Sequence, residues 1–367
     1  MTALPDARAK ALAIRLWLAC LATQELMTVY IGIRLGLYDC LLRDGPATTA
    51  EFAGRARIEH RYAREWLEQQ AVAGIVDVGN RGAPDDRVYS LPAGYGAVLT
   101  ASDSPLSVAP MAALPIGAVA RALPDLLEAY RTGDGVPDAV YGPDWREGHI
   151  AANRALFSHD LPLWLRTMLP DIHARLAGGA SRIADMACGA GWSSISLARS
   201  YPGTQVDGFD LDPVVLHTAR RNAADCGVGR RVSFAVRDAQ EPGDWLASRQ
   251  DGGYDLVCIF DALHEMPRPV DVLRCCRAIR APGGSVLVMD ARVSEVFTAP
   301  ADEIERFQYA TSVLHCLPAG RVGPSPAGTG TVMRQATVRE YALAAGFSAV
   351  DVIGVQERFH QLYRLSG

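Results

Sequence analysis

The strongest constraint on this chain is a strand–turn–helix pattern near its middle, in the run Arg182-Ile-Ala-Asp-Met-Ala-Cys-Gly-Ala-Gly-Trp-Ser-Ser194. An apolar strand leads into a glycine-rich turn and then into the start of a helix. A second strand follows and ends in Phe209-Asp-Leu-Asp-Pro213, which places an acid at its tip. This order builds a nucleotide-type site at the carboxyl edge of a parallel sheet.

The alternation of strands and helices continues through the C-terminal half. We expect strands at Arg182–Met186, Gln205–Phe209, Val232–Val236, Tyr254–Phe260 and Ser285–Met289. Helices fit between them, such as Val214–Cys226 and Val270–Ile279, and an inserted helix is expected over Ala301–Val313. The pattern predicts an α/β domain over residues 178–367, with a Rossmann-like, doubly wound parallel sheet.

The N-terminal part reads as a mainly helical domain over residues 1–105. Ala9–Leu42 has helical periodicity, and Gly32 and Gly36 predict a break in its second half. Thr48 or Thr49 is suited to cap a second helix. The sequence then predicts a helix over Arg61–Ala73 that ends at Gly74, followed by a hairpin of Ile75–Val78 with Val88–Leu91 around the tip Gly79–Arg87. This order is that of a winged helix.

A helical region over residues 106–177 is expected to connect the two domains and to line a substrate pocket. Its stretch Ala109–Tyr130 is interrupted by prolines, and Thr132–Trp145 reads as a loop because of its glycines and prolines. Helical pattern resumes near Ala151 and ends before Gly178.

A winged helix either reads DNA or only dimerises and lines a pocket. The candidate recognition helix carries Arg61 and Arg64 but also Glu65 and Glu68, and the net charge is -5, so we expect no nucleic-acid partner. No uninterrupted apolar run reaches the roughly 18 residues of a membrane span, and Met1–Arg8 does not resemble a signal peptide. The cysteines are scattered without a C-x-x-C pair, so we expect no metal site and a cytoplasmic protein with reduced thiols.

The glycine-rich turn is compatible with two kinds of cofactor. A dinucleotide site needs a third glycine at position 194, which is Ser194, and Asp185 would repel a pyrophosphate there. S-adenosylmethionine has no phosphate, and its amino acid end suits Asp185 and the turn at Gly189 and Gly191. Asp210 can accept both ribose hydroxyls.

A third acid, Asp238, follows the third strand and can accept the adenine amino proton. Each acid alone is equally well explained as a helix cap, but three at successive strand ends favour a cofactor site. The neighbouring residues expected to contact the cofactor are Ala187, Leu211, Ala239 and Phe260.

From about Ser181 to about Ala291 the chain resembles the class I S-adenosylmethionine-dependent methyltransferase family. It departs from the family's pattern at Ala187, where the first glycine of the turn usually stands. The resemblance implies S-adenosylmethionine as methyl donor and S-adenosylhomocysteine as product.

A candidate general base lies in Phe260-Asp-Ala-Leu-His-Glu-Met-Pro267, because His264 can take a proton near neutral pH. Glu265 or Asp290 are its candidate partners. The segment resembles the His-Asp motif of plant-type small-molecule O-methyltransferases, which implies that Asp290 orients His264. Met266 departs from that motif, and a structural histidine at the strand-to-helix turn is the alternative.

Two further residues are substrate candidates, Tyr141 and His315, the second of which is also explained by a core or capping role. The two-domain layout resembles bacterial winged-helix methyltransferases of secondary metabolism. That resemblance implies a homodimer through the N-terminal domain and a small aromatic or heteroaromatic acceptor, methylated on oxygen or on carbon such as C3 of an indole. A ligand-binding winged-helix transcriptional regulator and an NAD(P)-dependent oxidoreductase are the competing hypotheses.

Overall fold

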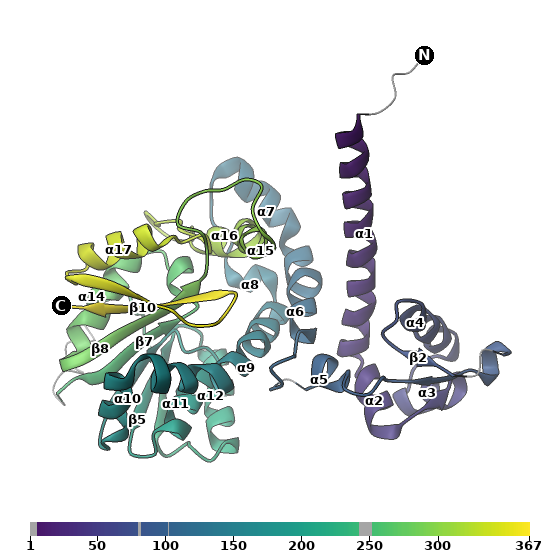
Figure 1. Ribbon diagram of the computed structural model, residues 1–367, viewed down its shortest axis with the longest axis horizontal. Helices are drawn as coiled ribbons and strands as arrows, with labels where there is room; N and C mark the ends of the chain where they lie inside the picture. The colour runs from purple at the N-terminus through teal and green to yellow at the C-terminus, as the bar shows by residue number, and fades with distance from the viewer. Residues whose placement is uncertain (1–5, 80–81, 102, 242–251) are drawn as a thin grey trace. The chain divides into compact units, whose positions relative to one another are not determined.

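The computed structural model describes residues 6–79, 82–101, 103–241 and 252–367, so the N-terminal Met1–Pro5 and part of the predicted hairpin tip lie outside the described residues. The chain divides into two compact units (Figure 1). One comprises Met1–Ala120 and Pro143–Ala152, and the other comprises Arg121–Gly142 and Asn153–Gly367. The predicted connecting region 106–177 is therefore distributed over both units.

The first unit begins with the long helix α1 (Ala7–Arg34), and the predicted break is found directly after it. Gly36 has a φ of 65° and separates α1 from α2 (Leu37–Asp44). Gly32 does not interrupt α1. A Cβ at Gly32 would lie 2.6 Å from the ring of Tyr38, so the glycine permits close packing of the two helices.

The winged-helix order is confirmed. Thr48 caps α3 (Thr49–Ala56) in a capping box with Glu51. The other elements of this part are α4 (His60–Val72), β2 (Asp77–Val78), η1 (Pro84–Asp86) and β3 (Val88–Ser90). Strand β3 pairs antiparallel with β2 and also with β1 (Ala47–Thr48), which was not predicted because it has only two residues.

The loop predicted over Thr132–Trp145 is wrong in its second half, where two helices lie. Helix α8 covers Asp138–Tyr141, and α9 (Pro143–Met168) begins with a proline in its first turn. Proline is favoured at that position, since its missing N–H has no partner within a first turn. The neighbouring helical elements are α5 (Gly96–Leu99), α6 (Ala109–Ala113), the π-helical η2 (Leu114–Val119), α7 (Ala120–Thr132) and α10 (Pro170–Ala177).

The second unit is built on a seven-stranded sheet with the order β6-β5-β4-β7-β8-β10-β9. The five predicted parallel strands are present as β4 (Arg182–Met186), β5 (Gln205–Asp210), β6 (Val232–Val236), β7 (Tyr254–Phe260) and β8 (Arg280–Ala291). Two antiparallel strands, β9 (Ala349–Ile353) and β10 (His360–Ser366), were not predicted. In the β8–β10 pairing, His360 is opposite Ala291 and Gln361 is opposite Asp290.

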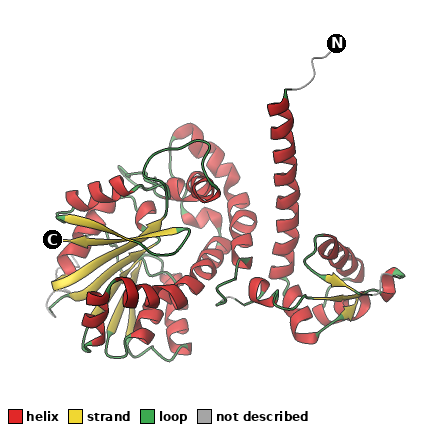
Figure 2. Cartoon of the chain, in the orientation of Figure 1, coloured by secondary structure: helices red, strands yellow, loops and turns green. Residues whose placement is uncertain are grey.

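Helices cover both faces of this sheet (Figure 2). They include α11 (Trp192–Ser200), α12 (Pro213–Asp225), α14 (Pro269–Ile279) and α17 (Gln335–Ala344). The other helical elements of this part of the chain are α15 (Glu303–Thr311), the π-helical η5 (Ser312–Cys316) and α16 (Leu317–Ala319). One apolar core contains Leu165, Ile195 and Leu216, and a second contains Val257, Leu273 and Val338. Burial on both faces explains why the central strands read as continuous apolar runs.

Helix α1 is apolar and largely exposed. Trp17 is 66% exposed and Ile14 is 61% exposed. By length and composition, α1 is the one helix in the described part of the chain that is able to cross a membrane, although only 6% of its most apolar window is buried. One helix of this kind does not establish a membrane segment. An exposed apolar helix face is equally typical of a helix that packs against another protein.

Candidate functional site

The glycine-rich turn between β4 and α11 adopts left-handed backbone conformations. Ala187, Gly189 and Gly191 have φ values of 56°, 52° and 78°. No atom lies within 4 Å of a Cβ built on Gly189, whereas one on Gly191 would be 2.6 Å from the ring of Phe234. Gly191 therefore permits internal packing, and Gly189 leaves open space over the main chain. Ala187 takes the left-handed conformation itself, at a cost of about 1–2 kcal/mol relative to glycine.

Asp185, near the end of β4, lies beneath the first turn of α11. Its carboxylate is 1% exposed, and Oδ2 accepts hydrogen bonds of 2.6 Å from both Ser193 and Ser194. Burial raises the pKa of Asp185 despite these two donors. Ser194, which replaces the third glycine of a dinucleotide motif, thus ties the helix to the strand. The predicted contact of Asp185 with the amino acid end of a cofactor stays a prediction.

Asp210 ends β5 and connects its tip to the glycine-rich turn. Oδ2 accepts a hydrogen bond of 2.9 Å from the Gly189 amide, and Oδ1 accepts one of 2.9 Å from the Asp212 amide. Burial raises the pKa of Asp210. A carboxylate has about four acceptor positions, so the amides of Gly189 and Asp212 do not saturate the Asp210 carboxylate. The neighbouring Leu211 is 58% exposed.

The other predicted cofactor residues follow the adjacent strands at the same edge of the sheet. Asp238 comes after β6, and its Oδ1 accepts a hydrogen bond of 2.8 Å from the Gln240 amide. Ala239 is partly buried beside it. Phe260 ends β7, and its ring lies 5.9 Å from that of Phe157. Since β6, β5, β4 and β7 are neighbours, the topology brings all the predicted cofactor residues to one edge.

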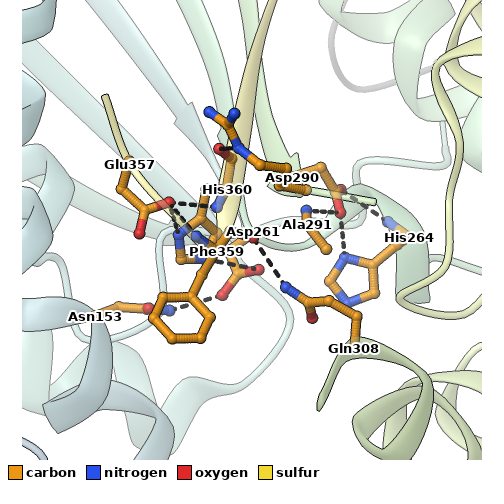
Figure 3. Close-up of polar contacts among 10 residues, drawn as sticks. Asn153, Asp261, His264, Asp290, Ala291, Gln308, Glu357, Phe359 and His360 are labelled. Carbon is orange, nitrogen blue, oxygen red and sulfur yellow. Dashed lines mark hydrogen bonds and ion pairs between the residues drawn. The ribbon is translucent and has the colours of Figure 1, made fainter. Parts of the chain in front are cut away.

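His264 and Asp290 form a buried pair next to this edge (Figure 3). His264 lies in the short 3₁₀ helix η4 (Leu263–Glu265) after β7, and Asp290 lies near the end of β8. Nδ1 of His264 is 2.7 Å from Oδ1 of Asp290, and the residues are 3% and 0% exposed. An ionised carboxylate only accepts hydrogen bonds, so Nδ1 of His264 carries the proton shared with Asp290. Nε2 of His264 points away from Asp290.

The charge state of His264 is set by opposing effects. Burial lowers its pKa, but the carboxylate of Asp290 and the neighbouring Cys316 raise it more, so the pKa of His264 lies well above its usual range. Asp290 is itself fixed, because its Oδ1 also accepts a hydrogen bond of 2.7 Å from the Ala291 amide. The pair can therefore hold a proton on the imidazole at neutral pH.

Glu265 belongs to a second group of polar side chains that does not include Asp290. Its Oε2 is 3.7 Å from Nδ1 of His315, whose Nε2 is 3.0 Å from Asp138 Oδ1. Burial raises the pKa of Glu265 to about 8, against the opposing charge of His264. His315 and Cys316 both lie in the π-helical η5 and are buried. Cys316 was not predicted, since neither spacing nor composition distinguishes it.

Tyr141 is completely buried within the second unit. Its hydroxyl donates a hydrogen bond of 2.8 Å to the carbonyl of Leu314, and its ring lies 4.6 Å from that of His315. These contacts give Tyr141 a packing role against η5, and its predicted contact with a substrate stays a prediction.

A third group of polar residues was not predicted (Figure 3). His360, at the start of β10, lies between two acids: its Nδ1 is 3.2 Å from Glu357 Oε2 and its Nε2 is 3.7 Å from Asp261 Oδ1. Asp261 directly follows β7, has a φ of 56°, and accepts a hydrogen bond of 2.9 Å from Asn153 Nδ2. The group places a protonated imidazole beside the carboxyl end of β7. Only the unpredicted strand β10 brings His360 to this edge.

Two family models match the chain over separate regions. Residues 183–284 match a methyltransferase domain, and residues 19–101 match an Rv2258c-like winged HTH domain. The chain thus carries an N-terminal winged-helix domain followed by a methyltransferase domain, as the order of its elements predicts.

Curated relatives and solved structures agree with this division. A ubiquinone biosynthesis O-methyltransferase from Xanthomonas axonopodis pv. citri is 32% identical over 117 residues, which cover 32% of this chain and 46% of that protein. The chain therefore spans about half the length of the curated relatives it matches. An O-methyltransferase family protein from Burkholderia thailandensis has a TM-score of 0.69 and 17% identity, with coverage of 100% and 99%. Human N-acetylserotonin methyltransferase, solved with SAM, has a TM-score of 0.67 and 18% identity, and both chains are covered completely. These structures share the fold of this chain.

Proposed function

We propose that this chain is an S-adenosylmethionine-dependent methyltransferase that acts on an oxygen nucleophile of a small acceptor. The carrying observation is the arrangement of the buried His264–Asp290 pair beside a glycine-rich turn that leaves open space over Gly189. The methyltransferase domain match over residues 183–284 supports the reaction class.

The residues at the sheet edge fit the cofactor. Open space at Gly189 allows a ligand to approach the main chain, and Asp210 retains acceptor positions for ribose hydroxyls. The turn would bind the amino acid end of the cofactor, and Asp185 would hold the turn in place through its hydrogen bonds to α11. Asp238 and Ala239 would bind the adenine, with Phe260 and Leu211 next to it. When bound, S-adenosylmethionine supplies a methyl group that is already activated.

The protein's own chemical task is then to orient the acceptor and to remove its proton. In its neutral form, His264 accepts that proton at Nε2, because Asp290 engages Nδ1. Asp290 stabilises the imidazolium that results and fixes the orientation of the ring. Glu265 and His315 extend the polar surface next to His264 and are suited to bind polar groups of the acceptor.

The acceptor in this proposal is a small aromatic or heteroaromatic natural product, such as a phenol. A hydroxyl acceptor uses a base during transfer, whereas C3 of an indole loses its proton only after attack and needs the base less. The buried carboxylate–imidazole pair therefore favours oxygen over carbon.

The two alternative functions fit the structure less well. A DNA-binding role requires free arginines on α4, but Arg61 pairs with Glu65, and Arg64 Nε is 3.1 Å from Glu68 Oε1. A dinucleotide requires a phosphate site at the N-terminus of α11, where the carboxylate of Asp185 holds Ser193 and Ser194.

The proposal includes a homodimer in the cytoplasm. A second copy of the chain is the proposed partner of exposed apolar α1, because a surface of that size is unfavourable in water. All eight cysteines are free thiols, which agrees with a reducing compartment.

Calorimetric titration with S-adenosylhomocysteine and with NAD tests the cofactor assignment, and radiolabelled methyl transfer to a panel of phenols and indoles tests the acceptor. We expect binding of S-adenosylhomocysteine, no binding of NAD, and methylation of phenols. Binding of NAD alone contradicts the proposal, and a shift of a DNA fragment at moderate salt without methyl transfer favours the regulator.

A further inference from the structure

A cluster of potential metal ligands lies beside the His264–Asp290 pair. It consists of the imidazole of His264, the carboxylate of Glu265 and the thiol of Cys316, and one ligand atom from each lies within 4.8 Å of the others. His264 is 3% exposed and Cys316 is 5% exposed, whereas the Glu265 side chain is 28% exposed. The cluster is therefore enclosed on one side and reachable on the other.

The donor atoms select a class of cation. One nitrogen, one sulfur and one oxygen suit a borderline-soft divalent ion such as Zn²⁺, whereas Mg²⁺ and Ca²⁺ prefer oxygen ligands alone. In a tetrahedral zinc site such ligand atoms are about 3.3–3.8 Å apart, so the cluster needs to close by at most about 1.5 Å. Side-chain rotation of partly exposed Glu265 can supply part of this movement.

The surroundings of His264 match those of a metal-bound histidine. Such a residue usually donates its second ring N–H to a carboxylate, which fixes the tautomer and raises the basicity of the ligating nitrogen. Asp290 Oδ1 lies 2.7 Å from Nδ1 of His264, so the carboxylate that would orient a metal-bound His264 is already in place. Cys316 lies in the π-helical η5, a type of segment that occurs often at functional sites.

We propose that His264 Nε2, a Glu265 carboxylate oxygen and Cys316 Sγ bind one Zn²⁺ ion, which inhibits the enzyme. On binding, the protons on Cys316 Sγ, on His264 Nε2 and on the Glu265 carboxyl pass to solvent as the zinc–sulfur, zinc–nitrogen and zinc–oxygen bonds form, with a fourth position open to water. The inhibition rests on the proposed function, because zinc occupies the lone pair with which His264 removes a proton. The binding itself does not depend on that function. Sequence spacing does not reveal the site, because its ligands come from two distant segments.

Titration of the chelator-treated full chain with Co²⁺ alone tests the binding. We expect one ion per chain, a thiolate-to-cobalt charge-transfer band, and loss of the band when Zn²⁺ is added. Cys316→Ala is expected to abolish the band. Cys275→Ala, which alters another buried cysteine on α14, is the matched control and keeps it.

Absence of the band in the unaltered protein overturns the site, as does a band that survives in Cys316→Ala. If thermal melting shows that Cys316→Ala does not fold, Cys316→Ser preserves the side-chain volume and is expected to lack the band. Asp290→Asn is expected to weaken zinc binding by about 10- to 100-fold without changing its stoichiometry.

Methyl-transfer rates with and without Zn²⁺ test the inhibition. We expect loss of rate on adding zinc and recovery on adding a chelator. Zinc that binds without lowering the rate overturns the inhibitory role. A protein that shows the cobalt band but no methyl transfer in the absence of zinc supports the site and contradicts the proposed function instead, so the two failures are distinguishable.

Discussion

Nδ1 of His264 lies 2.7 Å from Oδ1 of Asp290, and the two residues come from elements that are neighbours in the sheet. His264 follows β7, whose pairing with β8 ends at Phe260 and Met289, and the next residue of β8, Asp290, pairs antiparallel with Gln361 of β10. The Asp290 carboxylate accepts from the amides of His264 and Ala291 in addition. The backbone thus fixes the position of the Asp290 carboxylate and, through it, the direction of the imidazole.

Replacing His264 tests its role as base. We expect His264→Ala to lower the single-turnover rate of methyl transfer to a phenol by about 10²–10⁴-fold, because a positioned base contributes that factor. The affinity for S-adenosylhomocysteine, measured by calorimetry, should change little. His217→Ala, on the exposed side of α12, is the matched control. A near-normal rate in His264→Ala would assign the base to another residue or the acceptor to carbon.

The pH dependence of the rate tests the coupling to Asp290. The base must be neutral, and the carboxylate holds the pKa of His264 well above its usual range, so the rate should rise with pH through that raised pKa. Asp290→Asn removes the negative charge, and the rise should move to lower pH. Its plateau should fall by about 100-fold or more, since an amide can hold the wrong tautomer. An unshifted profile in Asp290→Asn means that another group controls the rate.

Asp210 is expected to control cofactor affinity and not the chemical step. Asp210→Asn should raise the dissociation constant of S-adenosylhomocysteine by about 10- to 100-fold, the value of one or two hydrogen bonds to a charged group. Asp212→Asn is the control, because Asp212 Oδ1 accepts from the Val214 amide and caps α12. Equal effects of both substitutions would indicate that Asp210 acts only on the local backbone.

His360 is expected to stabilise the fold in a pH-dependent way. Burial lowers its pKa, but Asp261 and Glu357 raise it to about 10, compared with an unfolded value of about 6.5. The stabilisation is therefore complete below about pH 6.5 and is lost as the pH rises through about 10. His360→Gln should lower the free energy of unfolding by about 3 kcal/mol at pH 6, and the difference from the unaltered protein should shrink at alkaline pH. Urea denaturation at several pH values measures this, and a difference that is constant with pH would contradict the assignment.

The exposed apolar face of α1 is expected to bind a second copy of the chain. Trp17→Asp should weaken dimerisation by about 30-fold or more, because buried tryptophans contribute strongly to interfaces. Light scattering after size-exclusion chromatography measures the mass as a function of concentration. Leu343→Asp, at a position of α17 that is 59% exposed, is the control and should leave the mass unchanged. A monomer in the unaltered protein removes this part of the proposal.

The sequence allows the parallel sheet and the winged helix to be predicted because their signals are local. Thr48 before Glu51 identifies a helix start, and the apolar runs of β4 and β7 identify buried strands. Strands β9 and β10 give weaker signals, since β10 begins with the polar pair His360 and Gln361, whose partners on β8 lie far away in the chain.

Site residues that follow strands with a strong local signal could be predicted, and residues that reach the site on elements with a weak signal could not. His264 and Asp290 follow predicted strands, so their meeting can be expected from topology. Cys316 and His360 reach the site through a π-helical segment and an antiparallel strand, and neither position follows from sequence periodicity. Tyr141 was placed on a loop, but it lies in a helix that begins after a proline.

The place of β10 between β8 and β9 has a consequence for how the protein is made. During synthesis, β10 leaves the ribosome after both of its neighbours, and β9 joins the sheet only through β10. The cofactor edge can therefore form early around β4, β5 and β6, whereas His360 reaches Asp261 only after translation of the last strand. A nascent chain would thus form the strands that flank the glycine-rich turn before it completes the polar group around His360.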